Sequence, residues 1–187
     1  MRVISGICKG RKLICPKILK IRPTTDRTKE FIFDYLGSRV CRAKILDLFS
    51  GTGNLGIEAL SRGAVEAYFV ENDRSVTQII YKNLQFTHFE SQAHVVKSDV
   101  FKFLKWVAPQ HIKFDLIFAD PPYQRNLVNK LLTEVDRNNI LLEGGTVILE
   151  YRKDALLERN YLNLIWQKTK IWGDTAVSFF IKSGDKN

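Results

Sequence analysis

Short apolar runs alternate with stretches of helical spacing along most of the chain. The runs are hydrophobic at nearly every position, which is typical of strands buried on both faces of a parallel sheet. They span residues 44–49, 66–71, 93–98, 114–120 and 146–151. The stretches between them place apolar side chains on one helix face and span residues 54–62, 75–86, 100–107 and 126–135. Repeated strand and helix units predict an α/β fold with a doubly wound, mostly parallel sheet and right-handed crossovers.

The two ends of the chain have different patterns. Near the C-terminus, residues 154–158 predict a short helical piece, and residues 163–172 and 176–182 predict two strands that pair as an antiparallel hairpin, which completes a seven-stranded sheet. At the N-terminus, residues 2–15 predict a short hairpin with Lys9-Gly10 at its turn.

A helix is predicted after Thr25 or Asp26, either of which is a suitable N-cap. The apolar residues of one face of this helix are Phe31, Ile32, Tyr35 and Leu36, and Gly37 stands at its C-terminal end. We expect residues 1–43 to form a small basic extension packed on the core, and residues 44–187 to form the main domain as one compact unit.

Excess positive charge is confined to the first quarter of the chain. The whole chain has a net charge of +9, and residues 1–44 alone hold twelve Lys and Arg residues against three acids. A solvated basic face would explain this excess. An arm that binds nucleic-acid phosphate would also explain it, because such asymmetry is the electrostatic footprint of that binding.

Several classes of protein are not favoured. No apolar run approaches the roughly 20 residues of a membrane span, and the N-terminus lacks the apolar stretch of a secretory signal, so we expect a cytoplasmic protein. The cysteines and histidines have no metal-binding or disulfide spacing; they are Cys8, Cys15, Cys41, His88, His94 and His111. We therefore expect no metal site.

The segment DLFSGTGNLGIEAL contains a glycine-rich turn between a strand and a helix. Gly51, Gly53 and Gly56 have GxGxxG spacing, and Glu71 follows Gly51 by twenty residues, which alone would permit a nicotinamide dinucleotide. Asp47 argues against it, because a carboxylate four residues before the first glycine would repel a pyrophosphate at close range. S-adenosylmethionine has a sulfonium and an ammonium group and no phosphate, so it suits this carboxylate better.

Acidic residues stand at the ends of four successive predicted strands: Asp47, Glu71, Asp99 and Asp120. They are expected to line one crevice, because ligands of open α/β sheets bind at the carboxyl ends of the strands. Glu71 can accept hydrogen bonds from ribose hydroxyls, and Asp99 can accept from an adenine amino group, with Val100 or Phe101 flanking the ring. A helix N-cap is the competing interpretation of Asp99.

The segment Asp120-Pro121-Pro122-Tyr123 follows the most apolar strand. The prolines fix the backbone, so the Asp120 carboxylate and the Pro121 carbonyl become rigid acceptors. Together they can accept both hydrogens of an exocyclic nucleobase amine and direct its lone pair at a methyl group. Tyr123 can stack on a base that has left its helix or loop. This chemistry needs neither a covalent enzyme intermediate nor a metal.

The motifs DLFSGTGNLGIEALSRGA, FVEND, SDV and FDLIFADPPY together resemble those of S-adenosylmethionine-dependent amino-methyltransferases. DPPY alone is shared by enzymes that methylate adenine N6, cytosine N4 and guanine N2. The N-terminal segments RVISGICKGRKL and IRPTTDRTKEFIFDYL resemble the RsmD family of 16S rRNA guanine-N2 methyltransferases. This resemblance extends from about Arg2 to Lys182.

The resemblance implies a Rossmann-like class I methyltransferase that acts, as a monomer, on 16S rRNA within a 30S particle or an assembly intermediate. The residues expected to hold S-adenosylmethionine are Asp47, Phe49, Gly51, Gly53, Asn54, Glu71, Asp99 and Val100. Those expected at the target amine and base are Asp120, Pro121, Pro122 and Tyr123. Those expected to contact RNA are Arg2, Lys9, Arg11, Lys12, Arg22, Thr24 and Arg27. Ser50, Thr52 and Asn54 depart mildly from the small residues usual in the family.

Three other functions stay open at this point. A DNA adenine-N6 methyltransferase would use the same amine chemistry, although no target-recognition insertion is visible in the chain. A non-catalytic RNA-binding protein could retain this fold. A nicotinamide dehydrogenase would leave DPPY and the basic arm unexplained.

Overall fold

The computed structural model describes residues 1–15, 25–122, 126–158 and 161–184. The strands are β1 (Lys44–Leu48), β2 (Glu66–Glu71), β3 (Ala93–Lys97), β4 (Phe114–Ala119), β5 (Leu141–Arg152), β6 (Leu164–Trp172) and β7 (Thr175–Lys182). The α-helices are α1 (Asp26–Leu36), α2 (Asn54–Ser61), α3 (Arg74–Thr87), α4 (Val100–Val107) and α5 (Leu127–Asn138). Short 3-10 helices are η1 (Gly37–Val40), η2 (Glu90–Gln92) and η3 (Ala108–Gln110).

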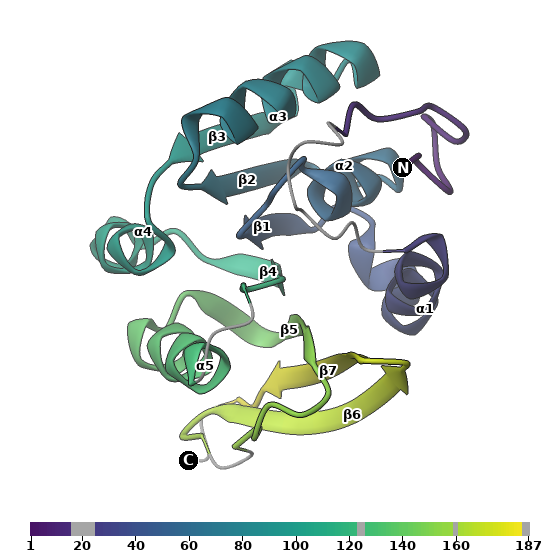
Figure 1. Ribbon diagram of the computed structural model, residues 1–187. Coiled ribbons are helices and arrows are strands. Elements are labelled where there is room, and N and C mark those ends of the chain that lie inside the picture. The colour runs from purple at the N-terminus through teal and green to yellow at the C-terminus, as the bar shows by residue number, and fades with distance from the viewer. Residues whose placement is uncertain (16–24, 123–125, 159–160, 185–187) are drawn as a thin grey trace.

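Within these residues the strands form one seven-stranded sheet with the order β3-β2-β1-β4-β5-β7-β6 (Figure 1). Strands β1 to β5 are parallel, and β7 runs antiparallel between β5 and β6. The predicted α/β fold, with a mostly parallel seven-stranded sheet and an antiparallel C-terminal hairpin, is confirmed.

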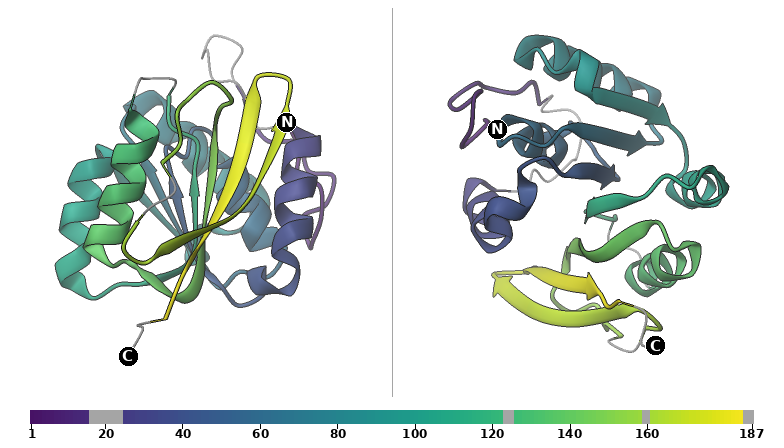
Figure 2. Two further views of the ribbon diagram at one scale, coloured as in Figure 1. Left: turned by 90° about the horizontal axis from the view of Figure 1, so that it is seen from below. Right: turned by 180° about the vertical axis from the view of Figure 1, so that it is seen from behind.

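Helices cover both faces of the sheet (Figure 2). One apolar cluster joins the sheet to α1, α2 and α3, through side chains such as Phe33, Ile57 and Ile80. A second cluster joins the opposite face to α4 and α5, through Leu104 and Leu131. Because both faces are covered, the central strands are apolar at almost every position, as the sequence pattern indicated.

The parallel strands end level with one another. Leu48 pairs with Val70 on one side and with Ala119 on the other, and Ala119 pairs in turn with Leu149. Strands β2 and β3 lie on one side of β1, whereas β4 and β5 lie on the other, so the chain changes direction between β1 and β4. In open α/β sheets, ligands bind in the crevice at such a switch point.

Two predicted elements differ from the structure. Residues 154–158 do not form the predicted helical piece: the chain turns there, with the Ala155 N–H donating to the Arg152 carbonyl at 2.9 Å. A segment this short closes too few hydrogen bonds to be stable as an isolated helix. β5 begins at Leu141 rather than at residue 146, because Phe114 pairs with Leu141 before the register shifts.

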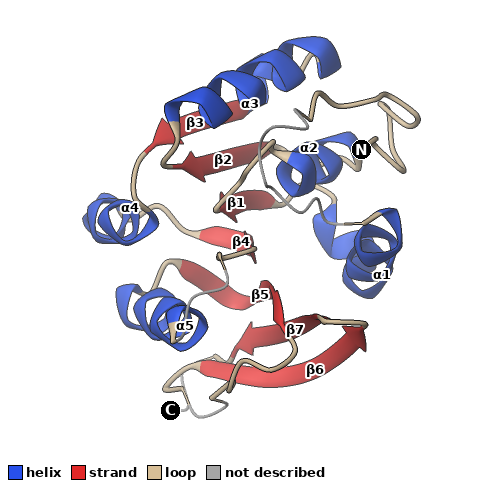
Figure 3. Ribbon diagram, viewed as in Figure 1, coloured by secondary structure: helices blue, strands red, loops and turns tan. Residues whose placement is uncertain are grey.

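The arm, which we define as residues 1–15, is mostly loop (Figure 3). The predicted hairpin is present only as one antiparallel bridge between Arg2 and Lys12, with the Val3 N–H donating to the Arg11 carbonyl at 2.9 Å. Val3, Cys8 and Leu13 are buried in the same apolar cluster as α1 and α2. The arm is therefore packed along its length despite having little regular structure.

Helix α1 begins as the sequence indicated. The Thr25 hydroxyl accepts the Thr28 N–H at 3.2 Å, so Thr25 is the N-cap, and Gly37 has a φ of 54° at the C-terminal end. Among the residues that the structure describes, no helix is long and apolar enough to cross a membrane. The same residues contain no cluster of His, Cys, Asp or Glu that could hold a metal ion.

Candidate functional site

The loop between β1 and α2 has a left-handed backbone at three positions. Phe49, Gly51 and Gly53 have φ values of 56°, 54° and 79°. Glycine adopts this conformation without strain, but Phe49 does not, because its Cβ crowds the backbone there. Such strained residues persist where the surrounding structure holds them, and they are frequent at ligand sites.

Gly56 allows helix α2 to lie close to the sheet. A Cβ at this position would come within 2.3 Å of the Phe69 ring and 3.1 Å of the Asp47 carboxylate. Instead, the Gly56 N–H donates to Asp47 Oδ2 at 2.9 Å. The third glycine of the GxGxxG spacing therefore has a packing role, and it fixes the direction of the Asp47 side chain.

Asp47 is 4% exposed at the end of β1. Burial raises the pKa of this carboxyl to about 8, the Gly56 hydrogen bond opposes the rise, and the nearby charge of Glu71 adds to it. A carboxyl poised near neutrality would ionise when a cation binds beside it. This behaviour fits a ligand that carries an ammonium group better than one that carries a phosphate.

Glu71 connects the glycine loop to the turn after β2. One of its oxygens accepts the Gly51 N–H at 3.0 Å, and the other accepts the Asp73 N–H at 3.0 Å. A carboxylate has about four lone-pair sites, so both oxygens can still accept bonds from a ligand's hydroxyl groups.

Asp99 is exposed and caps helix α4, where its Oδ1 accepts the Lys102 N–H at 3.0 Å. The competing interpretation of this residue as an N-cap is thus realised in the structure. A single cap bond leaves further acceptor capacity on the carboxylate, so the cap does not exclude a ligand contact. Val100, which follows it, is buried.

Asp120 and Pro121 follow β4 at the switch point. Asp120 is half-buried and comes one residue after Ala119, the residue that pairs with Leu48. It therefore lies beside Phe49, the first residue after β1. Pro121 is buried and Pro122 is exposed, whereas Tyr123 lies outside the described residues.

Asn54, the first residue of α2, belongs to a buried polar network that the sequence did not reveal. Its Oδ1 accepts from Lys29 Nζ at 2.9 Å, and Lys29, which is fully buried, also donates to Glu58 at 3.2 Å and to the Arg2 carbonyl. Burial lowers the pKa of Lys29, against the raising effect of Glu58. Within the described part of the chain, Asn54 Nδ2 is buried without an acceptor.

Asn83 of α3 makes a second connection that the sequence did not reveal. Its Oδ1 accepts the Ile14 N–H at 2.7 Å, while its Nδ2 donates to the Ile14 carbonyl at 3.1 Å and to the Thr52 carbonyl at 3.0 Å. Asn83 is fully buried. One side chain therefore holds both the end of the arm and the centre of the glycine loop. A polar residue on the apolar face of the predicted helix was the available signal.

The basic residues predicted to contact RNA differ in their surroundings. Arg2 forms an ion pair with Asp26 at 2.9 Å, and Arg11 donates to the Phe86 carbonyl. Lys9 and Lys12 are exposed. Arg27 is exposed on α1, and Arg22 and Thr24 lie outside the described residues.

Comparisons with known proteins agree with this geometry. The family model described as "Conserved hypothetical protein 95" matches residues 1–181. The protein named Ribosomal RNA small subunit methyltransferase D of Escherichia coli is 34% identical over 180 residues, which cover 96% of this chain and 89% of that protein.

Solved structures share the fold. The Escherichia coli protein yhhF has a TM-score of 0.87 at 34% identity, covering 98% of each chain. A structure from Streptococcus mutans, named as a SAM-dependent methyltransferase, has a TM-score of 0.63 at 19% identity, covering 83% of this chain and 48% of that chain. The predicted Rossmann-like class I methyltransferase fold is confirmed.

Proposed function

Because the chain belongs to the RsmD family, several of whose curated members are named Ribosomal RNA small subunit methyltransferase D, we propose that it methylates 16S rRNA. The reaction moves the methyl group of S-adenosylmethionine to the exocyclic N2 amino group of a guanine. The observation that carries the proposal is the position of Asp120-Pro121 at the switch point, beside the glycine loop and level with the end of β2.

The residues at the crevice suit S-adenosylmethionine chemically. Asp47 would face the ammonium group, and the left-handed loop of Phe49, Gly51 and Gly53 would lie along the methionine portion with Asn54 at its end. Glu71 would accept the ribose hydroxyls. Three carboxylates in one crevice would repel the pyrophosphate of a dinucleotide, so this donor set favours the sulfonium cofactor.

The adenine end of the cofactor would lie at the start of α4. Asp99 would accept from the adenine amino group, and Val100 would pack against the ring. The cofactor supplies an activated methyl group on sulfur when it is bound.

Asp120 and Pro121 would direct the target amine. The Asp120 carboxylate accepts one amino hydrogen and the Pro121 carbonyl accepts the other, so the nitrogen lone pair is withdrawn from the ring and aimed at the methyl group. Pro122 stiffens this turn, and Tyr123 would stack on the base. The surplus proton of the methylated amine leaves through Asp120 to water.

The arm would provide the RNA contact outside the crevice. We propose that Lys9 and Lys12, together with Arg2, Arg11, Arg22, Thr24 and Arg27, bind phosphates of 16S rRNA in a 30S particle or an assembly intermediate. Residues 1–43 and 44–187 would act as one unit, and a monomer would suffice, because every proposed site residue comes from one chain.

The test is transfer of tritiated methyl from S-adenosylmethionine to 30S particles from a strain that lacks the guanine-N2 modification, followed by nucleoside analysis. We expect N2-methylguanosine in 16S rRNA, and we expect Asp120→Ala to lower the rate by about 100-fold or more, as loss of one charge-positioning group does elsewhere.

The matched control is Asp115→Asn on the same strand. Asp115 accepts the Lys44 N–H at 2.7 Å at the opposite end of the sheet, so this change should leave the methylation rate nearly unchanged. Methyladenine in plasmid DNA without methylation of the particles would overturn the proposed substrate. Full activity of Asp120→Ala would remove Asp120 from the mechanism.

A further inference from the structure

Helices α4 and α5 present a group of cations and aromatic rings that the proposed chemistry does not use. Lys102, Lys105 and Trp106 are exposed on α4, and their spacing places them on one face of the helix. Trp106 is 53% exposed, so part of its ring is open to a ligand beside the two lysines. We call Phe101, Lys102, Lys105, Trp106 and Lys130 the α4–α5 surface.

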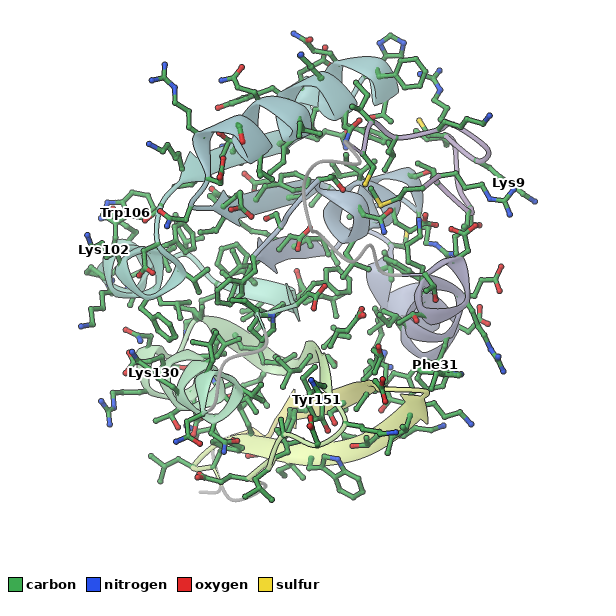
Figure 4. The ribbon with its side chains drawn as sticks, viewed as in Figure 1. Lys9, Phe31, Lys102, Trp106, Lys130 and Tyr151 are labelled. Atoms are coloured by element: carbon green, nitrogen blue, oxygen red, sulfur yellow. The ribbon has the colours of Figure 1, made fainter. Side chains whose placement is uncertain are left out.

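The α4–α5 surface is continuous across the two helices. Lys130 of α5 lies over the ring of Phe101, with its Nζ 4.2 Å from the ring centroid. Trp106 packs against Phe103 below it, at a centroid distance of 5.7 Å. Figure 4 shows Lys102, Trp106 and Lys130 on one side of the molecule, whereas Lys9 of the arm lies on the other.

The charge of this surface is positive and largely uncompensated. Helix α4 contains two lysines and no acid. The acids of α5 are engaged elsewhere: Asp136 is buried and accepts from the backbone of Leu162 at 2.7 Å, and Glu134 pairs with Arg137 at 3.7 Å. The one exposed acid at the start of α4 is Asp99, whose carboxylate caps the helix. Lysines beside aromatic faces suit a polyanion that also carries flat rings.

The surface also lies where a large substrate would cross it. Phe101 and Lys102 stand in the first turn of α4, and Lys130 stands in the first turns of α5, so all three lie near the carboxyl edge of the sheet that carries Asp120. The two ends of the arm reach the same edge from the opposite face, because Met1 contacts Thr52 of the glycine loop and Asn83 binds both Ile14 and Thr52. A nucleic acid whose base enters the crevice must continue past one or both of these faces.

We propose that the α4–α5 surface binds the sugar–phosphate backbone of the rRNA that flanks the target guanine, with Trp106 stacking on an unpaired base. The inference rests on the proposed function, and it adds a second RNA contact on the face opposite the arm. The three lysines neutralise phosphates, and Trp106 contributes stacking that does not depend on sequence. The substrate is held on both sides of the crevice, so its target base is centred over Asp120.

The first experiment measures the salt dependence of binding to unmodified 30S particles and to naked 16S rRNA. The variant Lys102→Gln/Lys105→Gln/Lys130→Gln keeps the side-chain stems and removes three charges. Each lost phosphate contact lowers the slope of log K against log salt by about 0.7 to 0.9, so we expect a decrease of about 2 to 3.

The matched control, Arg42→Gln/Lys82→Gln/Lys170→Gln, removes the same charge from exposed positions outside α4 and α5. It should change the slope of log K against log salt by less than the value for one phosphate contact, about 0.7 to 0.9. S-adenosylmethionine binding should be equal in all variants, which shows that they are folded. A slope equal to that of the wild type in the first variant would overturn the proposal.

Trp106→Ala separates stacking from charge. Loss of one stacked base should weaken RNA binding by about 5-fold or more without altering the salt slope. Weaker binding to 30S particles with unchanged binding to naked rRNA would assign the surface to a ribosomal protein and would also overturn the proposal. If the wild type does not methylate 30S particles, the proposed function is wrong. If the wild type methylates them and the variants bind and methylate equally well, only the second RNA contact is refuted.

Discussion

The arm and the C-terminal hairpin of β6 and β7 lie at two sides of helix α1, but they are held by different forces. The arm has a single β-bridge, and its backbone is bound mainly by side chains of α2 and α3. The hairpin is bound by the ladder hydrogen bonds of the sheet and by aromatic packing. Regular structure and firm attachment are therefore separate properties in this molecule.

Glu58 shows how the arm is attached. It is fully buried on α2, and its two oxygens accept the Ile4 N–H at 2.8 Å and the Ser5 N–H at 3.0 Å. The same carboxylate binds Lys29 and Arg62. One charged group thus satisfies four donors, and none of these bonds would be expected from the pattern of apolar residues.

The hairpin is attached to α1 by rings. Phe179 is fully buried, and its centroid lies 4.0 Å from that of Tyr35 and 5.8 Å from that of Phe31. Trp172 lies edge-on to Phe31 at 4.8 Å. Such contacts are short-ranged and tolerant of exchange among apolar residues, whereas buried charge is not. The arm should therefore be the more sensitive region to single substitutions.

The largest expected effect follows removal of Glu58. Glu58→Ala leaves the Lys29 charge buried without its partner and removes the acceptor of two arm N–H groups, so we expect a loss of about 3–5 kcal/mol in the free energy of unfolding. Urea unfolding measures it. Glu90→Ala, at an exposed acid on η2, is the control and should stay within about 0.5 kcal/mol of the wild type. If the urea midpoints of Glu58→Ala and Glu90→Ala were equal, Glu58 would not be what holds the arm.

Removal of Asn83 should have a smaller effect on stability and a specific effect on the crevice. Asn83→Ala leaves the N–H and carbonyl of Ile14 and the carbonyl of Thr52 without this partner, which costs about 1–3 kcal/mol. Because Thr52 is in the glycine loop, we also expect weaker binding of S-adenosylmethionine in a calorimetric titration.

The control for this experiment is Gln85→Ala, at an exposed position on the same helix. It should alter neither stability nor cofactor affinity. An Asn83→Ala protein that loses stability but binds the cofactor as the wild type does would show that the arm and the glycine loop are independent.

Because the pKa of Asp47 is raised, the free energy of unfolding should depend on pH. In the folded state burial holds the pKa at about 8, above the ordinary value of 3.8, so folding takes up a proton between these values. This contribution to stability is complete below about pH 4 and is lost as the pH rises toward 8, with a slope of up to about 1.4 kcal/mol per pH unit.

Asp47→Asn removes the titrating group. As the pH rises from 5 to about 8, the unfolding free energy of the wild type should therefore fall relative to that of the variant. Urea unfolding at several pH values tests this. Parallel pH profiles for the two proteins would show that Asp47 does not titrate in that range.

The sequence was informative where one force dominates. The apolar runs predicted β1, β2, β4 and the buried part of β5, because burial on both faces requires apolar residues at successive positions. Strand ends located Asp47, Glu71, Asp99 and Asp120 correctly at one edge. The N-cap at Thr25 follows from local chemistry and was one of the two positions that the sequence predicted.

The sequence was uninformative where distant polar groups meet. Lys29 and Glu58 look like ordinary helix-surface residues until their partners are known, and the position of Asn83 on an apolar helix face does not reveal which groups it binds. The partners that connect these residues across the molecule are 25 to 69 positions away in the chain. The short helix expected at residues 154–158 failed for a different reason: a segment this short is not stable as an isolated helix, and the chain turns there after β5. Long-range polar contacts leave no periodic signal.

The smallest expected effect tests the hairpin side of the comparison. Phe179→Leu keeps an apolar side chain at a fully buried position but loses the ring contact with Tyr35, and aromatic pairs contribute about 0.5–1.5 kcal/mol beyond their burial. A double-mutant cycle with Tyr35→Leu isolates that contribution in urea unfolding, and cofactor affinity should be unchanged in all three variants, because neither ring contacts the glycine loop among the described contacts. A coupling energy near zero would mean that the Tyr35–Phe179 ring pair does not help to hold the hairpin. A coupling as large as the effect of Glu58→Ala would mean that both regions depend equally on single side chains, and the contrast between them would disappear.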